Sequence, residues 1–298
     1  MKVFIDGSNG TTGLRLYDRL KQRTDITLFT LSEELRKDDD ARKEALFDSD
    51  IAFLCLPDDA ARQAVMMAEN SKVRIIDAST AHRTDSRFCY GFPELSKAHE
   101  EAIGNGNRIA VPGCHASGYI ALMYPLIACG LIPADYPAFC YSLTGYSGGG
   151  KAMIREYESE NRSGELDSPR LYALTQQHKH LKEMAYVTKS APPIFSPCVG
   201  DFYCGMLVSV PLFPKFLTMS VKLSDIKHIY EEAYGGKPYM KITDCDGMIT
   251  ANALAGSDIM EIIVTGNDER MVLNARYDNL GKGASGAAIQ CMDIMIKG

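Results

Sequence analysis

The chain has 298 residues, 46% of them hydrophobic, and a formal net charge of −6 at pH 7. This length and composition are sufficient for two packed globular domains. The net negative charge argues against a large phosphate-tracking surface, so a nucleic-acid partner is not expected. The longest apolar stretch, Ile120 to Ile132, contains Pro125 and is shorter than the roughly 18 residues of a membrane span, so no membrane partner is expected either.

The cysteine pattern points to a reducing compartment. Nine cysteines are present, an odd number with irregular spacing, and no secretory leader precedes the first predicted strand, Lys2 to Asp6. No Cys/His pairs stand at the spacing of metal ligands, so no metal site is expected.

A glycine loop follows the first predicted strand and precedes an amphipathic helix. The loop consists of Gly7, Ser8, Asn9, Gly10, Thr11, Thr12 and Gly13. Glycines allow the backbone to approach a phosphate closely, and the positive end of the helix dipole then faces the pyrophosphate of a dinucleotide. The pattern therefore predicts a dinucleotide-binding module, and the alternative is a plain strand-to-helix turn.

The choice of nicotinamide cofactor depends on the residues after the second predicted strand, Ile26 to Leu31. No Asp or Glu ends this strand to hold the ribose hydroxyls of NAD. Ser32, Arg36 and Lys37 offer instead a hydroxyl and two cations for the extra phosphate of NADP, which is favoured. Alternatively, the two cations are only part of the solvated face of the charged stretch Glu33 to Glu44.

Two further apolar runs, Asp50 to Leu56 and Val73 to Ala78, are typical of strands buried in a parallel sheet. Ligands of open α/β sheets bind at the carboxyl ends of the strands. Leu56 and Pro57 end the first run, and the loop Asp77 to Arg83, with Ser79 within it, ends the second. Arg83 is thus a candidate for binding an anion.

Cys114 is the candidate nucleophile. A short strand, Ile109 to Val111, leads through Pro112-Gly113 to Cys114, and a long apolar helix with Tyr119 to Ile132 follows. A helix N-terminus lowers a thiol pKa and can hold a developing oxyanion. The other eight cysteines do not combine a Gly-Cys turn with a helix start; the alternative for Cys114 is a buried structural cysteine.

A second glycine-rich segment follows the predicted strand Ala138 to Leu143. It includes Ser147, Gly148 and two further glycines, and ends at Lys151. We interpret it as a substrate or nicotinamide loop, the alternative being a flexible connector.

The acid–base group is expected among the histidines, because His has a suitable unperturbed pKa. His178 is the first candidate. His180 is the second, because we expect the two histidines to face opposite ways, so that both could not readily point at one sulfur. His115 adjoins Cys114, but it is expected to point away from its neighbour's side chain.

The rest of the chain reads as an α+β body with strands at Tyr203 to Leu212 and Ile259 to Thr265 and a helix at Ser224 to Tyr234. Small residues near the C-terminus precede Cys291, Ile294 and Met295 at helical spacing, which suggests a terminal helix packed on the first domain.

Six motifs, in order, resemble the short form of the N-acetyl-gamma-glutamyl-phosphate reductase family over nearly the whole chain: Gly7 to Gly13, Asp77 to Arg83, Pro112 to Cys114, Ser147 to Lys151, His178 to His180 and Asp278 to Gly286. The resemblance implies an α/β fold with a Rossmann-type NADP-binding domain (1–113, completed by a helix at 279–298) and an α+β catalytic and oligomerisation domain (114–278) like that of glyceraldehyde-3-phosphate dehydrogenase. It also implies a cytoplasmic homodimer or homotetramer that reduces N-acetyl-L-glutamyl 5-phosphate with NADPH in arginine biosynthesis.

Residue by residue, the resemblance implies that Cys114 is the nucleophile and His178 the acid–base group. Arg83 would bind the phosphate, and Asn279 and Gly281 would border the nicotinamide. We assign to substrate binding also His180, Ser147 and Lys151, and to cofactor binding also Leu56, Pro57, Ser79 and Gly148. The family commonly shows Asn-Pro-Gly-Cys-Tyr, whereas Val111 and His115 stand here.

Two alternatives stay open at this point. The chain could act on another acyl phosphate, such as aspartyl phosphate or N-acetyl-aminoadipyl phosphate, since no single residue decides between these substrates. It could also be a non-catalytic NADP-binding sensor, against which the combination of Cys114, His178 and Arg83 argues.

Overall fold

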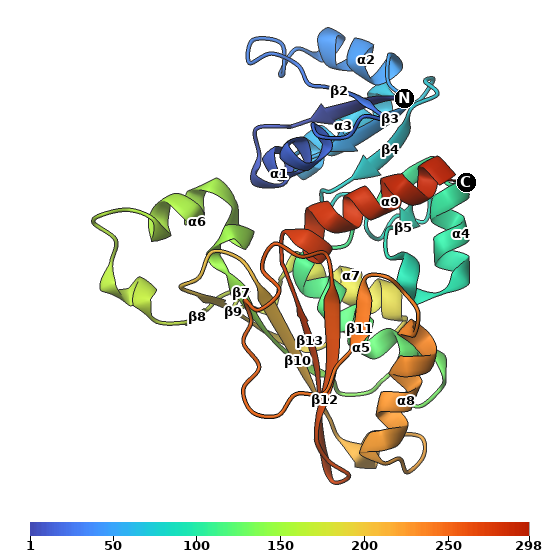
Figure 1. The fold of residues 1–298 in the computed structure, drawn as a ribbon, viewed down its shortest axis with the longest axis vertical. Coiled ribbons are helices and arrows are strands. Elements are labelled where there is room, and N and C mark those ends of the chain that lie inside the picture. The colour runs from blue at the N-terminus through green and yellow to red at the C-terminus, as the bar shows by residue number, and fades with distance from the viewer. Residues whose placement is uncertain (298) are drawn as a thin grey trace. The chain divides into compact units, whose positions relative to one another are not determined.

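A computed structural model describes residues 1–297 and confirms the predicted α/β class. The chain forms two compact units (Figure 1). The first comprises Met1–Pro93, Lys97–Pro112 and the chain from Ala284 onward; the second comprises Glu94–Ser96 and Gly113–Gly283. The chain thus returns to the first unit at its C-terminal end.

A six-stranded, fully parallel sheet forms the first unit. Its order is β2-β1-β3-β4-β6-β5, so the chain leaves β1 to one side and returns to its other side with β3. This reversal makes the carboxyl end of β1 the topological switch point, where ligands of such sheets bind. The strands are β1 (Lys2–Asp6), β2 (Thr27–Phe29), β3 (Ile51–Leu54), β4 (Arg74–Asp77), β5 (Cys89–Tyr90) and β6 (Arg108–Ala110).

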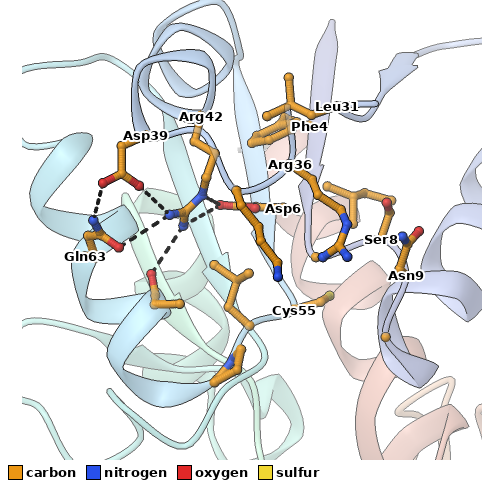
Figure 2. A pocket seen from close by; sticks show the side chains of 17 residues that line it. Phe4, Asp6, Ser8, Asn9, Leu31, Arg36, Asp39, Arg42, Cys55 and Gln63 are labelled. Carbon is orange, nitrogen blue, oxygen red and sulfur yellow. Dashed lines mark hydrogen bonds and ion pairs between the residues drawn. The ribbon is translucent and has the colours of Figure 1, made fainter. Parts of the chain in front are cut away.

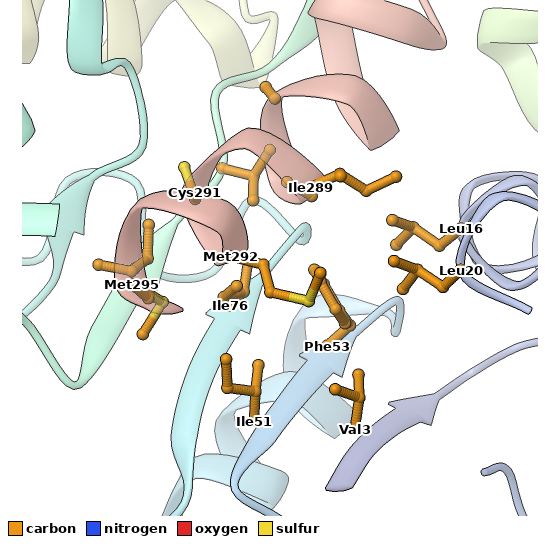
Figure 3. Packing of buried hydrophobic residues seen from close by; sticks show 14 of the residues in the cluster. Val3, Leu16, Leu20, Ile51, Phe53, Ile76, Ile289, Cys291, Met292 and Met295 are labelled. Atoms are coloured by element: carbon orange, nitrogen blue, oxygen red, sulfur yellow. The ribbon is translucent and has the colours of Figure 1, made fainter. Parts of the chain in front are cut away.

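Successive residues of these strands face opposite sides, and each side is covered by helices. On one face, Val3, Ile51 and Phe53 pack with residues of α1 (Thr11–Leu20), α4 (Lys97–Asn105) and α9 (Gly286–Lys297), as Figure 3 shows for much of this cluster. On the other, Phe4 and Ala52 pack against α2 (Asp39–Phe47) and α3 (Asp58–Met67). The period of two along buried strands therefore produces a three-layer unit.

The second unit is built on a seven-stranded mixed sheet of order β11-β12-β13-β10-β7-β9-β8. Only the pairs β11–β12 and β7–β9 are parallel. Contacts to this sheet come from α5 and α8, and α7 packs on α5. The elements are α5 (Cys114–Ala128), β7 (Phe139–Gly145), α6 (Gly150–Tyr157), β8 (Arg170–Leu171), α7 (Lys179–Thr188), β9 (Ile194–Gly200), β10 (Met206–Leu212), α8 (Leu223–Tyr234), β11 (Met240–Ile242), β12 (Met260–Asn267) and β13 (Arg270–Tyr277).

The central helix α5 is buried along most of its length although Pro125 lies inside it. Proline has no N–H, so the carbonyl of Ala121, four residues earlier, loses its helical donor. The hydroxyl of Tyr234 on α8 donates to this carbonyl at 2.7 Å. A neighbouring helix thus satisfies the acceptor that the proline leaves open.

Several predicted boundaries differ from the observed ones. Helix α5 begins at Cys114 and ends at Ala128, not at Ile132. The predicted glycine-rich loop after β7 is shorter than expected, because β7 continues to Gly145 and α6 begins at Gly150. Within residues 1–297, no helix has both the length and the apolarity needed to cross a membrane.

Candidate functional site

The glycine loop after β1 forms a cradle that only glycine fits. Gly7 has φ +86°, and a Cβ at this position would overlap the carbonyl oxygen of Cys55. A Cβ at Gly13, in the first turn of α1, would overlap the carbonyl oxygen of Gly7. The loop and helix are therefore packed without room for side chains, as close backbone approach to a phosphate requires.

The N-terminus of α1 is free to bind an anion. Its N-cap is Gly10, which supplies no side-chain hydrogen bond. Within residues 1–297, the buried hydroxyl oxygen of Thr11 has no hydrogen-bond partner. Unpaired helix N–H groups and an unused hydroxyl together fit the pyrophosphate of a dinucleotide.

We expect Gly13→Ala to weaken cofactor binding, because the new methyl group must separate α1 from the loop. Overpacking of this kind costs about 1–3 kcal/mol, so the free energy of unfolding should fall and the Kd for NADPH should rise. The control is Gly104→Ala in α4, where the nearest atom to the new Cβ is Ile294 Cγ2 at 3.8 Å. Fluorescence titration with NADPH measures the Kd of both variants. An unchanged Kd for Gly13→Ala would contradict the inference that the closely packed glycine loop binds the cofactor.

A pocket of about 460 Å³ opens beside this loop within the first unit (Figure 2). It is lined by eight of the predicted cofactor residues: Gly7, Ser8, Asn9, Gly10, Arg36, Lys37, Leu56 and Pro57. Five others of the first unit, Thr11, Thr12, Gly13, Ser32 and Ser79, do not line it, and the last three predicted, Gly148, Asn279 and Gly281, belong to the second unit. The pocket brings the glycine loop together with two cations of the segment after β2, a combination that fits NADP.

Arg36 is held at this pocket by an acidic neighbour. Its Nη2 lies 2.5 Å from Glu33 Oε1, and Glu33 also accepts a hydrogen bond from Asn9 Nδ2 at 2.7 Å. The pKa of Glu33 is lowered, chiefly by the hydrogen bond from Arg36. Glu33 thus links the predicted phosphate-binding cation to the glycine loop.

Arg42 and Asp6 were not predicted as residues of this pocket. Both line it, and Arg42 Nη2 lies 2.9 Å from Asp6 Oδ2, with exposed side-chain fractions of 6% and 2%. Burial raises the pKa of Asp6, while Arg42 opposes the rise. Arg42 lies in the charged stretch Glu33 to Glu44, which was interpreted as a solvated face. Its burial could have been inferred from its place three and four residues before Ala45 and Leu46, which pack against the sheet.

The loop after β4 carries Arg83 in a buried setting. Arg83 Nε donates to the carbonyl of Val111 at 2.8 Å, and Nη2 donates to that of Ala78 at 3.1 Å. Asp77 secures the same loop, because its carboxylate accepts hydrogen bonds from the backbone and hydroxyl of Ser79 and lies 2.6 Å from His82 Nδ1. Ser79 therefore has a structural hydrogen-bonding role in this loop.

Cys114 is half-buried and is the first residue of α5. Glu183, buried in α7, accepts a hydrogen bond from the backbone N–H of Gly113 at 2.7 Å. Tyr277 accepts from the N–H of Gly118 at 3.0 Å and donates to the carbonyl of Cys114 at 2.5 Å. The Tyr277 hydroxyl thus bridges two groups of the first helical turn, and both side chains fix the thiol-bearing turn in place.

Glu183 and Tyr277 were not identified from the sequence. Glu183 stands three residues after His180, a spacing that places both on one face of a helix, and this signal was available. Tyr277 comes from the far end of the second unit's sequence and offered no local signal.

Three histidines gather next to the Cys114 turn. The centroid of the His115 ring lies 5.7 Å from that of His178 and 5.5 Å from that of His180. The centroids of the His178 and His180 rings are 4.7 Å apart. The expectation that His178 and His180 face opposite ways is wrong, because their rings lie side by side with centroids 4.7 Å apart. His178 has an extended backbone before α7 begins at Lys179, and residues two apart in an extended run share one side.

The two candidate bases differ in environment. His178 is half-buried, caps α7 and accepts the N–H of His180 at Nδ1, at 3.2 Å, so its Nε2 carries the proton when the ring is neutral. Its pKa is lowered by burial and, to a lesser degree, by the charge of Lys179. His180 is buried.

The second glycine-rich segment contacts the C-terminal motif within the second unit. Asn279 Nδ2 donates to the hydroxyl of Ser147 at 3.0 Å, and its Oδ1 accepts from the N–H of Gly205 at 2.8 Å. Gly148 lies against the same amide, and Lys151 is exposed on α6. Ser147, Gly148 and Asn279 are thus brought together, whereas Lys151 points to solvent.

In the described part of the chain, no cluster of His, Cys, Asp and Glu could hold a metal ion.

Comparisons with known proteins show the family of the chain. Residues 114–279 match the family model described as semialdehyde dehydrogenase, dimerisation domain, and residues 28–103 match semialdehyde dehydrogenase, NAD binding domain.

Curated relatives are similar over their full lengths. The chain is 42% identical to N-acetyl-gamma-glutamyl-phosphate reductase 2 of a Nostoc species, covering 99% of this chain and 96% of the relative. It is 44% identical to N-acetyl-gamma-glutamyl-phosphate reductase of a Chelativorans species, covering 100% and 98%.

Solved structures share the fold at low identity. Aspartate semialdehyde dehydrogenase II from Vibrio cholerae has a TM-score of 0.76 at 16% identity, covering 99% of this chain and 98% of that one. Aspartate semialdehyde dehydrogenase with NADP from Candida albicans has a TM-score of 0.73 at 14% identity, with the same coverage. At this identity the likeness concerns the fold alone.

Proposed function

The chain belongs to the semialdehyde dehydrogenase family and, within it, to the N-acetyl-gamma-glutamyl-phosphate reductases, and from this we propose how its residues carry out that reaction. The protein is an oxidoreductase of arginine biosynthesis that reduces N-acetyl-L-glutamyl 5-phosphate to N-acetyl-L-glutamate 5-semialdehyde and phosphate, with NADPH as reductant. The observation that supports the site assignment is the half-buried Cys114 thiol at the first residue of α5, on a turn held by Glu183 and Tyr277.

Cys114 attacks the acyl carbon as a thiolate. The N-terminus of α5 offers N–H groups and a positive dipole end, which stabilise the thiolate and then the oxyanion of the tetrahedral intermediate. Phosphate leaves with the bonding electron pair, and a thioester on Cys114 remains. Arg83, at the end of the loop after β4, is the proposed cation for the phosphate group.

His178 manages the protons of these steps. It takes the proton of the Cys114 thiol before the attack. After hydride addition it exchanges a proton with the oxygen of the thiohemiacetal, whose collapse breaks the C–S bond, releases the aldehyde and returns the Cys114 thiolate. In the structure Nδ1 accepts the backbone N–H of His180. His178 can therefore take the thiol proton at Nε2 only in its other tautomer, with Nδ1 protonated and released from that N–H. His180, with its ring 4.7 Å away, is the second candidate and otherwise contributes to substrate binding, as do Ser147 and Lys151.

NADP fits the first unit, where the glycine loop, α1 and the cations Arg36 and Lys37 would hold it. When bound in reduced form it supplies the hydride that converts the thioester to the aldehyde level. Gly148, Asn279 and Gly281 are the proposed neighbours of its nicotinamide.

The activity is tested in the reverse direction by phosphate-dependent formation of NADPH from N-acetyl-L-glutamate 5-semialdehyde. Aspartate semialdehyde and N-acetyl-aminoadipate semialdehyde serve as competing substrates in the same assay. We expect the acetylated glutamate substrate to have the highest kcat/KM. A higher value for either competitor would reassign the substrate, and no turnover with any of them would favour an NADP-binding sensor.

The acid–base assignment predicts a pH profile. A general base must be neutral, and the pKa of His178 is lowered from 6.5 by burial and by Lys179. The acidic limb of kcat/KM should therefore lie below pH 6.5. Lys179→Gln removes one cause of the lowering, so the limb should move to higher pH, whereas Lys182→Gln removes the same charge farther along α7 and should leave it in place. An equal shift in both variants, or in neither, would argue against His178.

We infer that the protein is a cytoplasmic homo-oligomer, a dimer or a tetramer. The match of residues 114–279 to a dimerisation domain supports self-association through the second unit. The alternate residues Leu207, Ser209 and Pro211 of β10 are only partly buried, so one face of this sheet is available for a second copy. All nine cysteines are unpaired by disulfides, as in a reducing compartment. Light scattering of the purified protein measures the oligomer directly.

A further inference from the structure

His115, the residue after Cys114, links two hydroxyl groups deep in the second unit. Its Nδ1 lies 2.6 Å from Ser142 Oγ on β7, and its Nε2 lies 2.6 Å from the hydroxyl of Tyr172. His115 is 3% exposed and Ser142 is fully buried, whereas Tyr172 is partly exposed. The link therefore runs from the interior to the hydroxyl of a residue that is itself only partly buried.

The imidazole of His115 is neutral in this environment. Burial, and secondarily the neighbouring His178, lowers the pKa of His115 to about 3. A neutral imidazole has one N–H donor and one nitrogen acceptor. One of the two hydroxyls must therefore donate to His115, and the other must accept from it.

Ser142 decides which of the two arrangements is stable. Within residues 1–297, the hydroxyl of Ser142 has a hydrogen-bond contact with His115 alone. If Ser142 accepted from Nδ1–H, its own O–H would be buried without an acceptor, which is unfavourable. If Ser142 donates to Nδ1, every buried proton has a partner, since Nε2–H then donates to the oxygen of Tyr172.

The direction of this chain determines what Tyr172 can do. With its oxygen accepting from Nε2–H, the phenolic proton must point away from His115. The ring of Tyr172 has its centroid 6.1 Å from that of His178, the proposed acid–base group, so the phenol borders the proposed site.

We propose that His115 is a positioning residue that holds the Tyr172 hydroxyl as a hydrogen-bond donor to an oxygen of the bound acyl substrate. The proposal rests on the proposed function and extends it to a residue that neither titrates nor touches substrate. No covalent or redox step is involved: His115 orients, and Tyr172 donates.

The kinetic test compares His115→Phe, Tyr172→Phe and the double variant with wild type. Each single change should raise KM by about tenfold, the worth of one neutral hydrogen bond, while kcat stays within about twofold. The double variant should lose no more than either single one, because both remove the same contact. His115→Gln, whose amide can donate to Tyr172 and accept from Ser142, should recover most of the affinity.

Alkylation of Cys114 in the free enzyme separates positioning from a merely structural role. The iodoacetamide rate of Cys114 should be the same in wild type and His115→Phe. A slower rate, additive effects in the double variant, or no rescue by His115→Gln would overturn the proposal.

The tautomer is read independently by 15N NMR of histidine-labelled protein, with His115→Gln used to assign the signal. Nε2 of His115 should be protonated and Nδ1 should not; the reverse would overturn the proposal, whatever the kinetics show. Absence of wild-type turnover would instead reject the proposed function and with it the substrate contact, and the NMR result would still report the direction of the hydrogen-bond chain.

Discussion

Replacing Cys114 by Ser is expected to lower kcat by about 10⁴-fold or more, because loss of a nucleophile removes the covalent route altogether. A serine hydroxyl at the N-terminus of α5 keeps the size of the side chain, but it is not ionised there, since its pKa lies far above that of a thiol. The measurement is phosphate-dependent NADPH formation from the semialdehyde, with NADPH affinity followed in parallel.

The matched control is Cys245→Ser, which changes another partly buried cysteine of the second unit. This variant should retain wild-type kcat. Iodoacetamide should inactivate wild type and the Cys245→Ser variant at equal rates. Turnover by Cys114→Ser at a rate close to wild type would remove the thioester mechanism, and unchanged NADPH affinity in the variant excludes misfolding as the cause of its inactivity.

Replacing Arg42 by Met is expected to give the largest stability loss in the first unit. Asp6 and Arg42 are almost completely buried, and both Nε and Nη2 of Arg42 donate to Asp6 Oδ2, at 3.1 and 2.9 Å. Removing one partner of a buried ion pair leaves an uncompensated charge, which costs about 3–5 kcal/mol. Urea unfolding at pH 7, monitored by a probe in the first unit, measures this loss.

The loss should shrink as the pH falls. Burial already raises the pKa of Asp6 above 3.8, and Arg42 is the cause that opposes this rise, so the variant's folded state holds the Asp6 proton more tightly still. A group whose pKa is higher in the folded than in the unfolded state stabilises the folded state at low pH. The difference in free energy of unfolding between wild type and variant should therefore be smaller at pH 5 than at pH 7.

Two companion variants test the origin of this effect. Asp6→Asn combined with Arg42→Met removes both charges and should lose less than Arg42→Met alone. Lys2→Met breaks the exposed pair with Asp48, whose Nζ–Oδ1 distance is 2.6 Å, and should cost less than about 1 kcal/mol. If all three variants lost equal stability, the buried pair would have no special role.

Features that depend on adjacent residues were predictable from the sequence. The glycine loop after β1 requires glycine at Gly7 and Gly13, because a Cβ at either position would overlap a backbone carbonyl oxygen in the structure. The start of α5 is likewise encoded locally, by Pro112-Gly113 before Cys114 and a long apolar stretch after it. Strand and helix periods depend on the same neighbours, so the α/β class was predicted from the pattern.

Features that depend on distant residues were not predictable. Arg42 reads as one cation in a charged run, and only the packing of α2 on the sheet brings it to Asp6. No role was predicted for His115, because the partners of its two hydrogen bonds are 27 and 57 residues away along the chain.

By itself, the sequence determined where the glycine loop, the thiol-bearing turn and the buried strands occur, because backbone conformation and side-chain alternation are set by residues next to one another. Only the tertiary structure decided which distant side chains complete these features: Glu183 and Tyr277 at the nucleophile turn, Arg42 at the cofactor pocket and Ser142 at His115. Their positions follow from the order of the strands and the packing of the helices. Both depend on many weak contacts spread over the whole unit, so they cannot be predicted from any short segment of the chain.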